Sequence, residues 1–418
     1  MSNSIEVEMV YDTRKSQLAE EIRSQIVSGQ YDPGSRLPTR AELLEEYSAS
    51  NSTVQQALDD LIRNGFVETR GRAGTFVAQH PPHLTRLGLA YLFHPGFDDC
   101  SEWSRFHHAL NIESMNARLE NGRRFVSYYH LYDRQESNTA WLELCEDIQF
   151  HHLAGLIMVG NAGMFEFRTH ELDPELPRVC LDRSGDPEIP SVVPDMEKWL
   201  QRAARELVQR GRKRLGLIEF QAHETSAHDT TGIDRLLRLA ADAGASAEPI
   251  FYQPTMTLGP TAVSQTVRLL MSLPEDRRPD ALIVNDDNLV ESTVHGLVQS
   301  GVKVGPDGDI DVVVHANFPH PVHAPVPLIH LGYDVRLMLA TAIKLLDEQR
   351  GVPITERPRN REIVMPIISQ DEFRAYDNPL LQITPAIRKA KMQNRTDFPE
   401  SIESTEESIN HVLEYQTQ

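Results

Sequence analysis

Apolar residues recur at three- and four-residue steps along the first 65 residues, with charged residues between them, as on amphipathic helices. A first helix is predicted from Lys15 to Val27, a second around residues 43–47, and a third that Asn64-Gly65 should end. The apolar positions that define them are Leu18, Ala19, Ile22 and Ile26, then Leu43, Leu44 and Tyr47, then Val54, Ala57, Leu58, Leu61 and Ile62.

Two short apolar segments, "GFVET" and "GTFVAQ", follow the third helix around the turn "RGRAG" and predict a small β-hairpin. Three helices and a hairpin predict an α+β winged helix-turn-helix domain over residues 1–78. The segment 79–86, "QHPPHLTR", contains two prolines and is interpreted as a linker.

From residue 87 to 375 the pattern changes to apolar strands that alternate with long helices. Strands are predicted at 87–93, 124–131, 155–160, 178–182, 215–220, 249–253, 280–285, 309–316 and 362–368. Helices are predicted at 104–121, 194–210, 230–243, 259–272, 288–300 and 333–350. Nearly continuous apolar strands between helices predict parallel sheets covered on both faces. The expected fold is an α/β domain with two sheets side by side and a cleft between them.

The last segment, 376–418, is polar and contains the acidic run "PESIESTEES". We expect a poorly ordered acidic tail with at most one short helix.

The composition limits the partners of the chain. Its 418 residues include 41 Lys and Arg and 61 Asp and Glu, a net charge of −20 that disfavours broad attachment to nucleic acid or to anionic membranes. Cys100, Cys145 and Cys180 are too few and too widely spaced for a disulfide framework or a zinc cluster, and we expect buried thiols. Neither a signal peptide nor a membrane span is visible, so a cytoplasmic protein with no membrane partner is expected.

The first 80 residues resemble the GntR family of bacterial transcription regulators. The matching segments are "GSRLPT" (34–39), "YSASNSTVQQAL" (47–58) and "GFVETRGRAGTFV" (65–77). The resemblance implies that this domain binds a double-stranded DNA operator.

The rest of the chain resembles the effector-binding domain of LacI-type repressors, which has the fold of periplasmic sugar-binding proteins. The resemblance rests on residues 179–219, residues 278–317 and the helix after "LIHLGYD", in the family's order. A GntR-type head on a LacI-type domain is similar to the arabinose-repressor subgroup. This implies a homodimeric regulator, most simply a repressor, that responds to a small-molecule effector such as a sugar.

Candidate DNA contacts lie at the recognition turn, where polar side chains reach base edges, and in the wing. They are Arg36, Thr39, Arg40, Ser50, Asn51, Ser52, Thr53, Gln55, Gln56, Arg72 and Gly74. The family commonly has arginine where this chain has Ala41, Asn51 and Gln55. Residues 1–80 contain eight basic and twelve acidic side chains, so we expect weak counterion-release affinity and reliance on amide contacts to adenine. In the alternative interpretation these residues have no DNA-binding role: Ser50 only caps the helix, and the remaining side chains are solvated.

Candidate effector contacts lie at the predicted carboxyl ends of strands, where open α/β sheets bind ligands. They are His94, Asp182, Arg183, Glu219, Asn285, Asp286, His315 and Asn317, with Asp98, Asp99 and Asn161 at further strand ends. The resemblance independently favours Asp182, Asn285 and Asn317. The resemblance also implies a sugar-clamping arginine where the chain has Gly232 and an acidic residue where it has Ala316. The prediction of a free sugar as ligand therefore has less support than the prediction of the fold. Each strand-end residue could instead cap the following helix.

The stretch "HANFPHPVHAPVPLIH" has no regular metal-ligand spacing, and no metal site is expected. No P-loop or nucleophile elbow is present, so neither enzymatic activity nor a cofactor is expected. Two alternatives stay open: a degenerate regulator that responds to a protein partner, and an α/β enzyme with a winged appendage.

Overall fold

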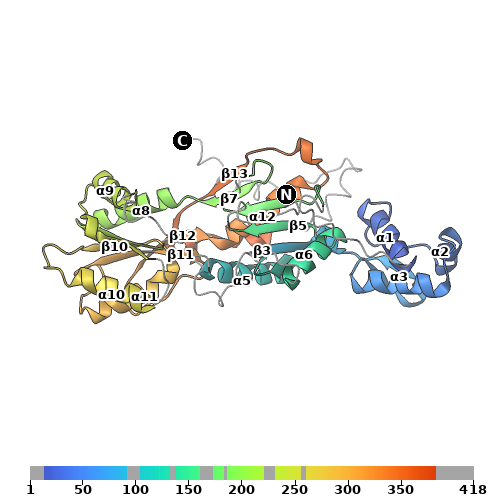
Figure 1. Cartoon of the computed structure of the whole chain (residues 1–418), viewed down its shortest axis with the longest axis horizontal. Helices are drawn as coiled ribbons and strands as arrows, with labels where there is room; N and C mark the ends of the chain where they lie inside the picture. Colours follow the sequence, from blue (N-terminus) through green and yellow to red (C-terminus); the bar gives the residue numbers. More distant parts are fainter. Residues whose placement is uncertain are drawn as a thin grey trace, which may run out of the picture.

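The chain is described by a computed structural model that covers residues 14–91, 104–121, 123–131, 138–160, 173–182, 186–220, 231–255 and 260–382. Three bodies lie in a row along the long axis (Figure 1). A small head is followed by a first and then a second α/β lobe. No helix of the described residues is long and apolar enough to cross a bilayer.

The head is built from three helices and a hairpin. Its elements are α1 (Arg14–Val27), α2 (Arg40–Glu46), α3 (Asn51–Arg63), β1 (Val67–Thr69) and β2 (Thr75–Val77). The predicted apolar positions form its core, because α3 buries Val54, Ala57, Leu58 and Leu61 along one face. Gly65 ends α3 in a left-handed conformation, with φ 79°, as predicted. β1 and β2 pair antiparallel, so the predicted winged helix-turn-helix is confirmed.

Each lobe contains one six-stranded sheet. The first sheet has the order β13 (Glu362–Met365), β7 (Ser191–Pro194), β6 (Arg178–Leu181), β5 (Gly155–Val159), β3 (Arg86–Tyr91) and β4 (Arg124–Tyr128). The second has the order β14 (Ile368–Ser369), β12 (Ile329–Asp334), β11 (Asp311–Phe318), β10 (Ala281–Val284), β8 (Leu215–Phe220) and β9 (Tyr252–Thr255). All pairings are parallel except that of β14 with β12. Every residue of β5 and β10 is buried, as expected for parallel strands covered on both faces.

Helices cover both sheets. They are α5 (Ser104–Asn121), α6 (Thr139–Gln149), α8 (Met196–Gln209), α9 (Thr231–Ala243), α10 (Pro260–Met271), α11 (Val290–Gln299), α12 (Val335–Gln349) and α13 (Gln370–Ala375). In the second lobe, α8 and α9 lie on one side of the sheet and α10 and α11 on the other (Figure 1). The backbone crosses between the lobes three times: from β7 to α8, from β12 to α12, which packs on the first sheet, and from β13 to β14.

Several predicted strands differ from those in the structure. Residues 249–251 form a 3-10 turn that starts at Pro249, and the strand predicted at 249–253 is β9, at 252–255. The strand predicted at 362–368 is two strands, β13 and β14, which belong to different sheets. The proline at position 366 lies between them and interrupts the pattern. β7 and β12 were not predicted as strands.

Two predicted boundaries also differ. Within the predicted linker, Pro82–Thr85 forms one helical turn, α4, and β3 already begins at Arg86. Beyond residue 375, Pro379–Gln382 forms a 3-10 turn that packs on α5 and α12 and buries Leu380. Contacts with the α/β domain therefore extend past the boundary predicted for the tail. Residues 383–418 lie outside the described residues.

Candidate functional site

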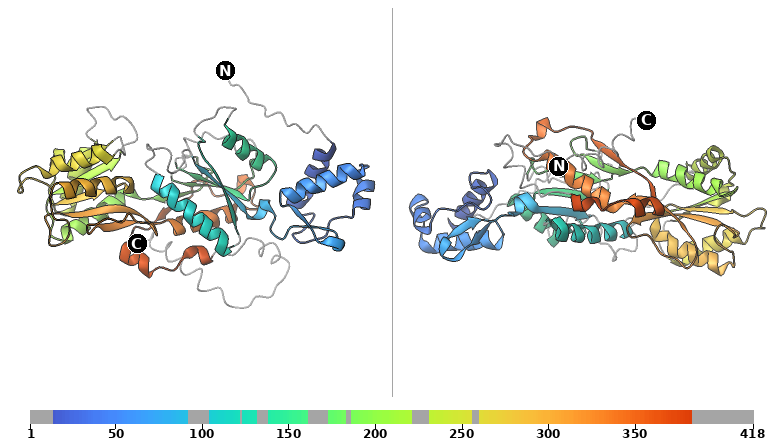
Figure 2. Two further views of the ribbon diagram at one scale, coloured as in Figure 1. Left: turned by 90° about the horizontal axis from the view of Figure 1, so that it is seen from below. Right: turned by 180° about the vertical axis from the view of Figure 1, so that it is seen from behind.

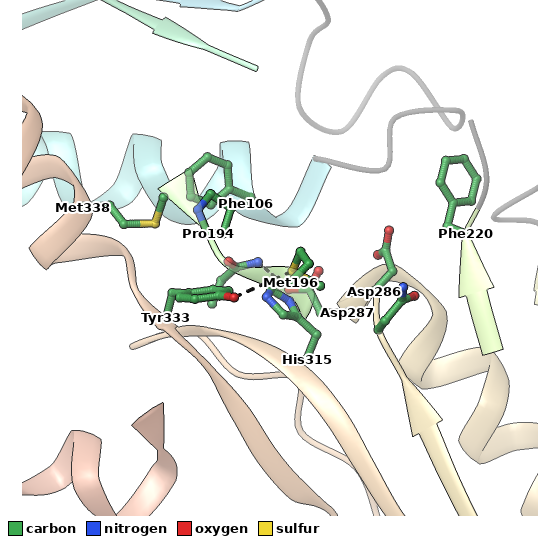
Figure 3. Close-up of a pocket in the computed structure, with 11 residues that line it drawn as sticks. Phe106, Pro194, Met196, Phe220, Asp286, Asp287, His315, Tyr333 and Met338 are labelled. Carbon is green, nitrogen blue, oxygen red and sulfur yellow. Dashed lines mark hydrogen bonds between the residues drawn. The ribbon is translucent and has the colours of Figure 1, made fainter. Parts of the chain in front are cut away.

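A cavity of about 190 Å³ lies between the two lobes, at the carboxyl ends of the second sheet's strands (Figure 3). This is far larger than the roughly 15 Å³ that one water molecule requires. Its lining residues are Phe106, Pro194, Met196, Phe220, Asn285, Asp286, Asp287, His315, Asn317, Tyr333 and Met338. Both lobes contribute, because Phe106 and Met338 lie on α5 and α12, which cover the first sheet.

Asn285 follows β10 and presents an unpaired acceptor in this cavity. Its amide nitrogen Nδ2 donates to Glu219 Oε1 at 2.7 Å, which fixes the orientation of the amide. The carbonyl oxygen Oδ1 is buried and has no hydrogen-bond partner within the described part of the chain. A buried acceptor without a partner costs about 1–3 kcal/mol, so a donor group on a ligand would stabilise it.

Glu219 lies behind the cavity and is itself fully engaged. Besides Asn285, it accepts hydrogen bonds from the Tyr252 hydroxyl at 2.8 Å and from the Arg235 guanidinium. The position of the expected clamping arginine, Gly232, lies against this group. A Cβ at Gly232 would be 2.1 Å from the Tyr252 hydroxyl, so the tyrosine side chain fills the space. The chain has thus replaced an arginine clamp by a Glu219-centred network.

The centre of the cavity is polar and holds one histidine and two carboxyl groups, those of Asp286 and Asp287. Burial lowers the pKa of His315 to about 4, so its ring is neutral at pH 7, and the Trp199 and Tyr333 rings lie 5.7 Å from it. Asn317 Nδ2 donates to Asp287 Oδ2 at 2.8 Å. Burial raises the pKa of Asp287 to about 6, although the hydrogen bond from Asn317 opposes that shift.

The structure therefore brings together four of the predicted effector residues, namely Asn285, Asp286, His315 and Asn317. Glu219 is not in the lining. Asp182 is not in it either; it follows β6 in the first sheet, and its amide donates to the carbonyl of Val192. His94 and Arg183 lie outside the described residues, as do Asp98, Asp99 and Asn161.

Sequence reasoning missed the apolar wall of the cavity. Figure 3 shows Phe106, Pro194 and Met338 along one side, with Phe220 at the end of β8 on the other. Phe220 is a strand-end residue and could have been found by including apolar residues at strand ends. Phe106 and Met338 lie on helices, and only the packing of the two lobes brings them to the cavity.

In the head, the predicted recognition turn has two kinds of side chain. Ser50 accepts a hydrogen bond from the Thr53 amide and caps α3, and Thr39 caps α2 in a capping box with Glu42. Asn51, Ser52 and Gln56 are exposed on α3. Thr53 is half-buried.

Gln55 is half-buried, and its amide nitrogen donates to Asp59 at 2.6 Å. Ser50 therefore caps α3, while the side chains of Asn51 and Gln56 make no hydrogen bond within the described residues.

The arginines near the wing also differ in whether their guanidinium groups are already paired within the protein. Arg70 donates to Glu68 and stacks on Phe76 at 4.4 Å. Arg36 lies over Gly74, 3.1 Å from where a Cβ of that residue would be. Arg40 and Arg72 are exposed and form no ion pair with any described residue. Among the described residues of the wing and turn, Arg36, Arg40 and Arg72 are therefore the arginines that can contact a polyanion.

Comparison with known proteins agrees with both parts of this geometry. Residues 14–77 match the family model of bacterial regulatory proteins of the gntR family, and residues 204–369 match that of periplasmic binding protein-like domains. The chain joins a GntR-type head to a periplasmic-binding-protein-like domain.

Relatives match the chain over different lengths. The arabinose metabolism transcriptional repressor of Geobacillus stearothermophilus is 25% identical over 355 residues, which is 80% of this chain and 92% of the relative. The transcriptional repressor PurR of Aliivibrio fischeri is 26% identical over 180 residues, 43% of this chain and 52% of PurR. A LacI-family regulatory protein from Chloroflexus aggregans has a TM-score of 0.51 at 14% identity, over 68% of this chain and 96% of that one, and so shares the fold.

Two polar contacts join the lobes of the periplasmic-binding-protein-like domain beside the cavity. Arg105 on α5 pairs with Glu291 on α11 at 3.0 Å, and Glu113 on α5 pairs with His320, after β11, at 2.8 Å. Helix α5 therefore holds the lobes together in the described conformation, and opening the cavity would break both contacts.

Proposed function

We propose that this protein is a transcriptional repressor whose affinity for its operator changes when a small molecule binds the cavity between the lobes. The observation that carries the proposal is the buried, unpaired Asn285 Oδ1, which Glu219 holds in the lining of that cavity. Effector contacts are proposed for Asn285, Asp286, His315 and Asn317. The similarity to an arabinose metabolism repressor over 80% of this chain supports the same function.

The lining also favours a class of ligand. Asn285 Oδ1 and the carboxylate of Asp286 are acceptors, and none of the described lining residues is Lys or Arg. Phe106 and Phe220 add aromatic surface. An uncharged ligand with several hydroxyl or N–H donors and one apolar face fits this set best, and a sugar ring has these properties.

The coupling to DNA follows from the way the two lobes share the cavity. A ligand that contacts both lobes binds one arrangement of the lobes more tightly than another, and it can shift their equilibrium only by that difference in affinity. Three backbone crossings form the hinge, and the head is attached to the first lobe. A changed lobe arrangement therefore changes the position of the heads in a dimer.

The effector proposal is tested by thermal shift with pentoses, hexoses, uronates and nucleosides. A ligand that binds only the native state must raise the Tm. For the ligand that does so, Asn285→Ala is expected to weaken binding about 5- to 100-fold, because a buried hydrogen bond is lost. Gln201→Ala on α8 removes an amide outside the cavity and is the control. Equal binding by Asn285→Ala and the wild type would refute this assignment.

We further propose a homodimer formed by one side of both lobes. Met115, Leu269 and Val298 are large apolar side chains that are 68%, 71% and 53% exposed. They lie on α5, α10 and α11, which occupy the same side of the molecule in two views (Figures 1 and 2). A two-fold operator requires two heads related by such an interface.

Light scattering is expected to give twice the chain mass of 47.3 kDa. The double substitution Leu269→Glu with Val298→Glu should return the mass to that of one chain, because it places charge in an apolar interface. Ile250→Glu changes an exposed apolar residue outside these helices and should leave the dimer intact. A dimer that survives the double substitution would exclude this face.

A further inference from the structure

A second cavity, of about 390 Å³, lies where the head meets the first lobe. Its lining residues are Arg63, Asn64 and Gly65 at the end of α3, Pro82 of α4, and Arg86, Arg124, Phe125, Val126 and His152 of the first lobe. We call it the junction groove. Neither the predicted DNA contacts nor the effector cavity shares a residue with it.

The junction groove belongs to a packed interface between the two bodies. The buried Arg23 of the head lies between the rings of Phe66, at 5.4 Å, and Phe150 of the first lobe, at 5.0 Å. Phe66 also stacks on His83 and contacts His152, with ring centroids 5.8 and 5.7 Å apart. Desolvated cation–π contacts stabilise the rings and the guanidinium group that form them. The groove walls are therefore held in place from both sides.

The junction groove carries an excess of positive charge. Arg86 and Arg124 are register partners at the start of β3 and β4, and Arg63 extends from the end of α3. Arg86 pairs with Asp147 at 2.8 Å, and Arg63 pairs with Asp60 at 3.2 Å. Arg124 is exposed and has no ion-pair partner among the described residues.

The ring of His152 adds an unsatisfied polar atom. Its Nδ1 lies 2.8 Å from Asp147 Oδ1, which places a proton on that nitrogen. Its Nε2 is buried and has no hydrogen-bond partner in the described structure. In this tautomer Nε2 is an acceptor, which a P–OH group of a phosphate can satisfy beside the guanidinium groups.

We propose that the junction groove binds a small molecule that carries a phosphate group. Guanidinium groups bind phosphate oxygens through paired, charge-assisted hydrogen bonds. Phe125 and Pro82 offer apolar surface to an attached organic part, and the volume exceeds that of a bare ion. Bound there, the ligand touches both α3 and β4, so its occupancy fixes the head against the first lobe.

The position of the groove favours a source of that phosphate other than the operator backbone. Helix α3 has 13 residues. At 1.5 Å per residue its far end lies about 18 Å from the recognition turn at Asn51. Duplex DNA held at the recognition turn does not reach the opposite end of the helix. The ligand is therefore a free, phosphorylated small molecule, and its binding requires no DNA.

The test titrates inorganic phosphate into the full-length protein without DNA, at an ionic strength held constant with sodium chloride, and follows the Tm. Phosphate is expected to raise the Tm of the wild type above that in chloride alone. Arg124→Gln and Arg63→Gln should each weaken phosphate binding about 10- to 100-fold, because each removes charge-assisted hydrogen bonds.

Arg205→Gln is the matched control, because Arg205 is an exposed arginine of α8, outside the groove. It should bind phosphate as the wild type does. Equal responses of the wild type to phosphate and chloride, or unchanged binding by Arg124→Gln, would overturn the site. Unchanged phosphate binding by Arg63→Gln would overturn the claim that the ligand contacts both the head and the first lobe. All three outcomes are independent of effector binding in the cavity between the lobes.

Discussion

Substituting Asn51 and Gln55 together with alanine is expected to abolish the sequence preference of the head for its operator. Both side chains lie in the first turns of α3, and the family's usual arginines are missing at these positions. An amide that pairs with adenine through two hydrogen bonds contributes about 1–3 kcal/mol of discrimination, so the two together contribute roughly 2–6 kcal/mol. Operator affinity should fall to the level of nonspecific DNA.

The structure adds a condition to this expectation. The Gln55 amide donates to Asp59 in the free protein, so reading a base requires that hydrogen bond to be exchanged. The exchange reduces the net gain from Gln55, and Asn51, which has no such partner within the described residues, should contribute the larger share. The single substitutions would show this difference directly.

The measurement is a gel shift at low salt against the DNA upstream of the protein's own coding region, with a base-shuffled competitor. Gln30→Ala, at an exposed position after α1, removes an amide outside the recognition turn and should leave retention unchanged. Specific retention by the double variant would show that Gln56 or the wing arginines determine the sequence preference instead.

The head could be predicted from its sequence because its signals are local. Ser50 starts α3, Gly65 ends it, and the apolar positions between them form the buried face. In the lobes, α5 also has its predicted bounds. β7 and β12 were not predicted. β7 is a four-residue segment that ends in Pro194, and β12 follows a proline-rich loop. Each segment is a strand because it pairs on both sides, β7 with β6 and β13, and β12 with β11 and β14.

The cavity could be predicted in part for a similar reason. Strand ends meet at one edge of a parallel sheet, so Asn285 and His315 converge without any knowledge of the packing. Strand order alone does not tell which strand ends line the cavity: Asp182 follows β6, and the parallel neighbour β7 ends at the lining residue Pro194, yet Asp182 is not among the lining residues. Glu219, also identified at a strand end, is not among the lining residues and instead supports Asn285 from behind the lining.

That supporting role gives Glu219→Ala the largest expected effect on stability. The carboxylate is nearly buried, and its loss would leave the Arg235 guanidinium without its ion pair and the Tyr252 hydroxyl and Asn285 amide without their acceptor. Removing one partner of a buried ion pair typically costs about 3–5 kcal/mol of unfolding free energy. Urea unfolding measures this directly. Glu356→Ala, at an exposed glutamate, should stay within about 0.5 kcal/mol of the wild type.

Glu219→Gln separates the charge of this residue from its shape. The glutamine keeps the volume and one acceptor oxygen, which can still receive the Tyr252 hydroxyl or the Asn285 amide but cannot neutralise Arg235. We therefore expect a stability between those of the wild type and Glu219→Ala.

Because Asn285 then competes for a single acceptor, its Oδ1 should no longer be held toward the cavity. Thermal shift with the wild-type effector should show weaker binding even under conditions where the variant is fully folded. If Glu219→Gln bound the effector as tightly as the wild type, the network around Gly232 would be structural only, and the orientation of Asn285 would have another cause.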